Sequence, residues 1–175
     1  LGAYDHILFL VGLTAIYRPS QWRAVLILIT AFTVGHSITL ALAALEVLPV
    51  NTALIEFLIP VTILLTALNN VVRQPATRPS VLRVNYALAL VFGLIHGMGF
   101  SNYLRSLLGS QAEIVTPLLG FNIGLELGQI LIVAVIFAVL TLFHALGTPH
   151  RSWNLFVSGA VAGVAFILAT ETFPW

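Results

Sequence analysis

The sequence has no cysteine and no lysine, and it carries little charge of either sign. The absence of cysteine excludes disulfide bonds and metal sites built from thiolates. Charged residues make up 7% of the 175 residues, whereas soluble domains carry roughly 25%, so a water-facing surface cannot be covered. The net charge is +1 and no basic run is present, so we expect no nucleic-acid partner.

Long apolar runs account for most of the chain, which is 59% hydrophobic with a mean hydropathy of +1.06. A helix needs about 20 apolar residues to cross a bilayer. Six runs have almost no polar face, which disfavours the helical core of a soluble protein. We therefore predict an all-α, polytopic transmembrane bundle of six helices in a single domain over residues 1–175. The predicted spans are residues 3–17, 22–45, 52–72, 84–107, 114–143 and 153–173.

The arginines predict how the bundle is oriented. Six of the seven fall in the loops that join each odd span to the next even one, namely Arg18, Arg23, Arg73, Arg78, Arg83 and Arg151. Arg105 lies on the other side, together with Glu46, Glu113 and Glu171. Because basic residues are retained in the cytoplasm, both termini should face outside. We expect a multi-pass integral protein of the bacterial inner membrane.

Five ionisable residues lie inside the predicted spans: Asp5, His6, His36, His96 and Glu126. Each costs a few kcal/mol in hydrocarbon unless it is paired, hydrated or coordinated. From the helical rise, His36 lies roughly 15 Å and Glu126 roughly 18 Å below the outer surface. Similar depths predict one metal site open to the outer face. Imidazole and carboxylate ligands without thiolate suit nickel, cobalt, zinc or iron(II) better than copper(I).

Other residues are expected to support this site. Four are candidate polar neighbours, although Ser37 is equally expected to bond to its own helix: Ser37, Glu56, Asn122 and Gln129. Five glycines are candidates for close helix packing because small residues let backbones approach: Gly93, Gly97, Gly120, Gly124 and Gly128. Taken singly, each histidine also has a simpler interpretation as a hydrogen-bonded link between helices.

The cytoplasmic half of the bundle contains few polar residues. No string of ionisable side chains continues from the histidines to the inner face. Only four polar residues of the third span lie there, namely Thr62, Thr66, Asn69 and Asn70. His144 and His150 fall between the fifth and sixth predicted spans. We expect these two histidines to be solvated in a loop.

Four motifs carry a family resemblance: DHILFL from Asp5, TAFT followed by HSITL over residues 30–40, GLIHGMGF from Gly93, and GFNIGLELGQ from Gly120. With these motifs in this order, the chain resembles the HupE/UreJ family over residues 3–135. The resemblance implies a six-helix-type membrane protein associated with nickel or cobalt uptake. It also implies that Asp5 and His6 form the metal motif and that His36, His96 and Glu126 are metal or proton residues.

Three functions follow from these observations. The first, which we favour, is a permease for a divalent transition metal such as nickel or cobalt, with no catalytic residues. The second is an intramembrane zinc-type hydrolase or acyl-transfer enzyme, in which the metal lowers the pKa of bound water to about 7 and Glu126 is the base. The third is a non-catalytic subunit of a larger membrane complex. The expected partners are the lipid bilayer and the metal ion. A homo-oligomer or a larger membrane complex is a further alternative.

Overall fold

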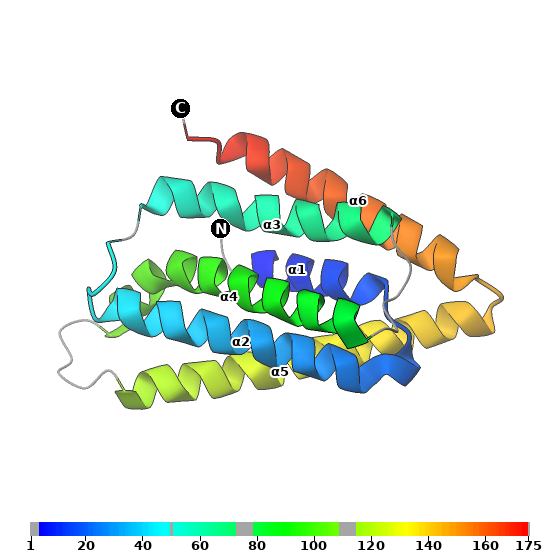
Figure 1. The fold of residues 1–175 in the computed structure, drawn as a ribbon, viewed down its shortest axis with the longest axis horizontal. Helices are drawn as coiled ribbons and strands as arrows, with labels where there is room; N and C mark the ends of the chain where they lie inside the picture. Colours follow the sequence, from blue (N-terminus) through cyan, green and yellow to red (C-terminus); the bar gives the residue numbers. More distant parts are fainter. Residues whose placement is uncertain (1–3, 50, 73–78, 109–114, 175) are drawn as a thin grey trace.

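The computed structural model describes residues 4–49, 51–72, 79–108 and 115–174, and every regular element in these ranges is helical. This confirms the predicted all-α fold with six helices (Figure 1). The elements are α1 (Tyr4–Ala15), the 3₁₀ turn η1 (Pro19–Gln21), α2 (Trp22–Ala44), α3 (Thr52–Val72), α4 (Pro79–Leu108), α5 (Val115–Ala145) and α6 (His150–Glu171).

Helices α2 to α6 each contain a segment long and apolar enough to cross a membrane, whereas α1 has 12 residues and is shorter. The predicted bounds of the second and third spans agree with α2 and α3. Helix α4 begins at Pro79 rather than at residue 84, and α6 begins at His150 rather than at residue 153. Helix α6 begins with His-Arg-Ser, and α4 begins four residues before Arg83, so an apolar run does not include these starts. Proline at the first helical position of α4 is favourable because its missing N–H has no helical partner there.

Helices α2 and α4 lie in close backbone contact. A Cβ atom added to Gly93 would overlap with the backbone of Phe32, and one added to Gly97 would overlap with the carbonyl oxygen of His36. The Thr39 hydroxyl on α2 donates a hydrogen bond to the Leu94 carbonyl on α4 over 2.7 Å. The close packing predicted for Gly93 and Gly97 is therefore present, and it fixes α2 against α4.

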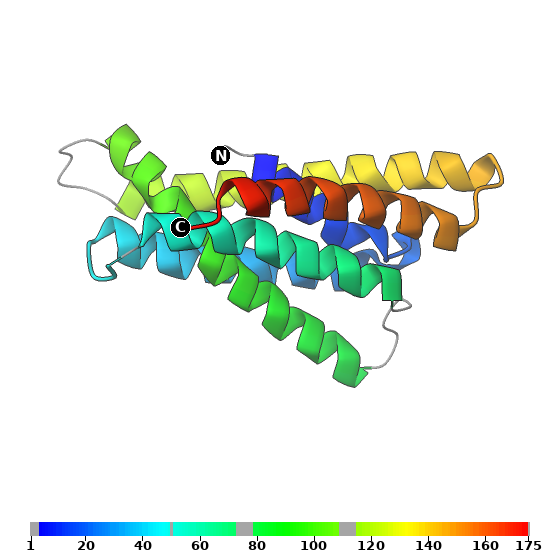
Figure 2. The same cartoon turned by 90° about the horizontal axis from the view of Figure 1, so that it is seen from above.

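The remaining helices pack around this pair. Helix α3 packs along α6, and α1 contacts α3, α5 and α6. The helices follow the long axis of the molecule, with α4 clearly inclined to the others (Figures 1 and 2). The side chains of Phe9, Phe32 and Ile63 have at most 1% of their surface exposed. They belong to one apolar core to which all six helices contribute buried side chains.

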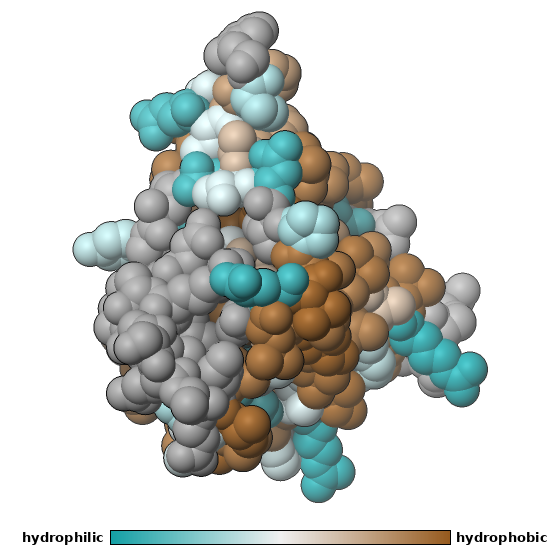
Figure 3. Space-filling model, turned by 90° about the vertical axis from the view of Figure 1, so that its left-hand side faces the viewer, coloured by the Kyte–Doolittle hydropathy of each residue, from teal (hydrophilic) through white to brown (hydrophobic). Residues whose placement is uncertain are grey.

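The flanks of the bundle are apolar. Large side chains such as Leu127 and Leu131 on α5 and Phe156 and Phe166 on α6 are exposed. Figure 3 views the bundle from the left-hand end of Figure 1, and hydrophobic side chains cover much of the part that is not grey, with hydrophilic ones projecting at its edge. Together with the long apolar helices, these flanks describe a multi-pass integral membrane protein.

The glycines of α5 do not pack like those of α4. A Cβ atom added to Gly120, Gly124 or Gly128 would meet no other atom within 4 Å. The predicted packing role of these three glycines is therefore not met by any described residue of the chain itself. Their face of α5 is open.

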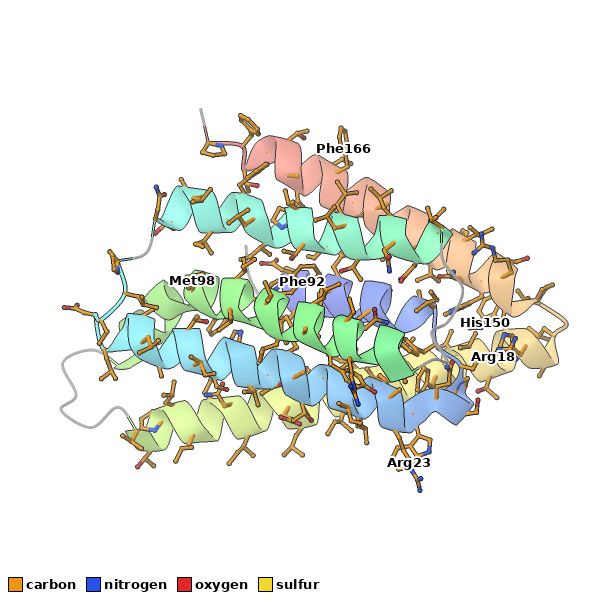
Figure 4. All side chains as sticks on the ribbon, in the orientation of Figure 1. Arg18, Arg23, Phe92, Met98, His150 and Phe166 are labelled. Carbon is orange, nitrogen blue, oxygen red and sulfur yellow. The ribbon has the colours of Figure 1, made fainter. Side chains whose placement is uncertain are left out.

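One end of the bundle carries several of the arginines. Arg18 lies near His150, the first residue of α6, and Arg23 lies at the start of α2 towards the same end (Figure 4). We refer to this end as the arginine end. Arg73, Arg78 and Glu113, which were also used to predict the orientation, lie outside the described residues.

Candidate functional site

Three histidines from three helices meet in the interior. The ring centroid of His6 on α1 lies 5.2 Å from that of His36 on α2 and 5.3 Å from that of His96 on α4. His36 and His96 are 0% and 1% exposed. The glycine contact holds α2 against α4 and so brings His36 and His96 to the same region. Helix α1 supplies His6, whose ring approaches both of them. We call these three residues the histidine cluster.

Aromatic rings surround the histidine cluster. The ring centroid of His96 lies 5.3 Å from Phe9 and 5.1 Å from Phe32, and that of His36 lies 6.3 Å from Phe121. Such a wall restricts the access of water and keeps the local dielectric low, which strengthens the attraction between a cation and its ligands.

The hydrogen bonds of Thr62 assign the tautomer of His96. The Thr62 hydroxyl donates to the Ile59 carbonyl over 2.7 Å, so its oxygen is left to accept from the His96 Nε2 atom at 3.2 Å. His96 therefore carries its proton on Nε2, and its Nδ1 atom presents a lone pair. Thr62 thus orients a nitrogen that can bind a metal, as partners of metal-ligating histidines commonly do.

Several buried polar atoms at this position have no hydrogen-bond partner among the described residues. They are Asp5 Oδ1, His6 Nε2, both ring nitrogens of His36, and His96 Nδ1. More than 90% of buried polar groups in proteins have a partner, so a concentration of exceptions indicates water or an ion. These atoms are the donors that a divalent transition metal prefers.

The spacing of the histidine rings suits a shared metal, although their nitrogen atoms do not point to one common position. Two imidazoles bound to one tetrahedral metal, with metal–nitrogen bonds of about 2.0–2.1 Å, have ring centroids about 5 Å apart. The two measured distances of 5.2 and 5.3 Å are close to this value. As the side chains stand, no three His, Asp or Glu residues of the described ranges are arranged to hold one ion. Side-chain rotation would be needed to bring the nitrogens to one point.

Two carboxylates lie near the start of α1. Asp5 is 6% exposed, next to His6, and the charge of Glu56 on α3 acts on it. Glu56 itself is exposed. The negative charge of this pair would attract a cation to the same end of α1 that carries His6.

The polar residues of α5 bind α2 below the histidine cluster. Glu126 Oε1 accepts a hydrogen bond of 2.7 Å from Thr30, and Gln129 Oε1 accepts one of 2.9 Å from Thr33. Thr30 precedes His36 by six residues, which places it roughly 9 Å farther along the α2 axis. Glu126 therefore faces α2 but is not among the residues that meet at the histidines.

The other predicted neighbours bond within their own helices. Ser37 Oγ donates to the Thr33 carbonyl over 2.7 Å, which agrees with its simpler interpretation. Asn122 Nδ2 donates to the Leu118 carbonyl over 2.9 Å. Thr62, in contrast, was noted in the sequence only as a polar residue of the third span. Its role depends on the rotation of α3 relative to α4, which no local pattern encodes.

The prediction that His144 and His150 are solvated loop residues is wrong. Helix α5 extends to Ala145 and α6 begins at His150, so both histidines are helical, and both are only partly exposed. The sequence misses this position because the apolar runs end before the helices do.

A shallow groove of about 400 Å³ runs along the outside of α2 and α4. Its lining is mainly apolar and consists of Leu26, Ile27, Thr30, Ala31, Val34 and Leu90. None of the three clustered histidines lines it. The groove therefore gives no support to an enzyme that takes a lipid substrate from the side of the bundle.

The fold and the site together define a polytopic α-helical membrane protein with a histidine cluster buried among its helices. The chain belongs to the HupE/UreJ family: the family model described as HupE / UreJ protein matches residues 1–172, nearly the whole chain. This family is related to nickel and cobalt transport. No match was found among curated proteins or among solved structures.

Proposed function

We propose that this protein is a permease for a divalent transition-metal ion, nickel or cobalt, in the inner membrane, and that the histidine cluster binds the ion in transit. The proposal rests on three histidine rings from three helices that meet inside an aromatic wall. The ring centroid of His6 lies 5.2 Å from that of His36 and 5.3 Å from that of His96. Membership of a transport-related family supports it.

The ion would be captured in two stages. Asp5 and Glu56 raise the local concentration of cations near the start of α1, because two neighbouring negative charges attract cations. The ion then exchanges part of its hydration shell for the free nitrogens of His6, His36 and His96. Neutral imidazole suits nickel and cobalt, and the hydrogen bond to Thr62 holds one ligand in the correct tautomer.

Uptake of nickel by cells that express the protein tests this function. Replacing His36 with alanine removes a ligand, and we expect uptake to fall by more than about tenfold. The matched control is Ser37→Ala, because Ser37 neighbours His36 but bonds only to its own helix. We expect this control to transport nickel at nearly the wild-type rate. Wild-type uptake by His36→Ala, at an equal amount of protein in the membrane, would contradict the proposal.

A further inference from the structure

A second pair of histidines lies at the arginine end, away from the histidine cluster. His144 is in the last turn of α5 and His150 is the first residue of α6. Their ring centroids lie 5.5 Å apart, with the ring planes inclined by 61°. This distance is also close to the value of about 5 Å for two imidazoles on one tetrahedral metal.

Both rings present a buried nitrogen without a partner. The His150 Nε2 atom lies 3.0 Å from the Ile16 carbonyl oxygen. A carbonyl only accepts, so Nε2 carries the proton and Nδ1 has the lone pair. His150 Nδ1 and His144 Nε2 are both buried, and neither has a hydrogen-bond partner within the described ranges. The carbonyl of Ile16, the residue that follows α1, thus fixes the tautomer of His150, as Thr62 fixes that of His96.

We propose that His144 and His150 form a second binding site for a divalent transition-metal ion, with water completing the coordination shell. Two protein ligands bind less tightly than three, and the positive charge of Arg18 nearby weakens the site further (Figure 4). A weak site suits release, since an ion in transit must be able to leave. The release role rests on the proposed permease function, whereas the binding site itself does not.

A row of polar residues joins the two sites. Thr62, Thr66 and Asn70 recur every four residues and share one face of α3. Thr62 contacts His96, and the Asn70 carbonyl accepts a hydrogen bond of 2.8 Å from Asn154 on α6. Asn154 lies one turn after His150. From the helical rise, the row from Thr62 to Asn70 extends roughly 12 Å, and Asn154 to His150 adds roughly 6 Å along α6. Asn69, which the sequence grouped with these residues, is exposed and does not belong to the row.

In this structure the side-chain amide of Asn70 is held in a hydrogen bond that blocks passage along the row. Its nitrogen donates to the Gly12 carbonyl on α1 over 2.6 Å. Asn154 is engaged on the other side, where its Oδ1 accepts from Ser158 over 3.0 Å. Passage of an ion would require these bonds to open. The second site therefore lies beyond a closed contact between α1, α3 and α6, which separates it from the histidine cluster.

Nickel binding to the purified full chain in detergent, with any affinity tag removed, tests the second site. Equilibrium dialysis against Ni²⁺ with metal analysis by mass spectrometry gives the number of ions per chain. We expect two ions for the wild type, one tight and one weak. In the variant H144F/H150Q the weak ion should bind more than about tenfold more weakly. Phenylalanine keeps a ring at position 144, and glutamine keeps an N–H donor for the Ile16 carbonyl.

Two further variants keep the result interpretable. H144F alone leaves the bond between His150 and Ile16 in place and should also lose the weak ion. H36A should lose the tight ion and retain the weak one. This result does not depend on whether nickel uptake requires His36. Failure of the permease function is therefore distinguishable from failure of this second site. A single ion on the wild type, or a weak ion that persists in H144F/H150Q, would overturn the inference.

Discussion

Replacing Gly97 with alanine should disturb the contact between α2 and α4 at the level of the histidine cluster. Gly97 follows His96 directly, and its Cβ position overlaps with the carbonyl oxygen of His36 and the hydroxyl oxygen of Thr39. The carbonyl belongs to the backbone of α2 and cannot rotate away. The two helices must therefore separate, which would also strain the bond from Thr39 to the Leu94 carbonyl.

The size of the effect follows from the contact distances. Non-bonded atoms pack best at about 3.5–4.0 Å, so relief of the overlap moves α2 and α4 apart by roughly 1 Å. Overpacking of this kind destabilises proteins by about 1–3 kcal/mol. Metal–ligand distances hold to about 0.2 Å in a well-formed site. A separation of roughly 1 Å would therefore weaken metal binding by more than about tenfold.

The same substitution at Gly124 is the control, since a Cβ atom there meets nothing within 4 Å. We expect Gly124→Ala to be neutral or slightly stabilising, because alanine has the higher helix propensity. Thermal unfolding in detergent gives the stability of each variant, and metal analysis after dialysis gives the nickel retained. Equal unfolding temperatures and equal nickel contents for Gly97→Ala and Gly124→Ala would refute the packing argument.

Three further substitutions test individual side chains. Thr62→Val keeps the shape but removes the acceptor for His96 Nε2, so nickel affinity should fall about 10–100-fold; unchanged affinity in a titration would mean that the bond does not orient the ligand. Asn70→Leu removes the donor to the α1 backbone and should lower the free energy of unfolding by about 1–3 kcal/mol, which thermal unfolding measures. Glu126→Gln retains an oxygen to accept from Thr30, so bound nickel should stay at the wild-type level, and its loss would place the Glu126 carboxylate in the site.

Helix positions could be predicted from the sequence because the requirement is simple: a span needs a run of apolar residues of sufficient length. Helices α2 and α3 accordingly match their predicted bounds. The starts of α4 and α6 could not be predicted in this way, since Arg83 and the His-Arg-Ser sequence from His150 interrupt the apolar pattern there. The depth estimate was less accurate: it placed Glu126 only about 3 Å deeper than His36, whereas Glu126 bonds to Thr30, roughly 9 Å along α2 from His36.

The rotation of each helix could not be predicted. In a membrane, the lipid-facing and protein-facing sides of a helix are both apolar, so periodicity does not tell which side is buried. The three glycines of α5 therefore looked like those of α4, although only Gly93 and Gly97 meet another backbone. The position of α5 along the bundle axis was equally unpredictable, and it decides that Glu126 bonds to Thr30 rather than joining the histidines.

Joint binding of one transition-metal ion by His6, His36 and His96 underlies the proposed permease function. Metal analysis of purified protein tests it most directly, with wild type, His36→Ala and His96→Ala loaded with nickel or cobalt and dialysed exhaustively against metal-free buffer. Close to one tightly held ion per wild-type chain, lost in both folded variants, is the predicted result. An equal amount of metal in all three proteins, or none in any of them, would contradict it.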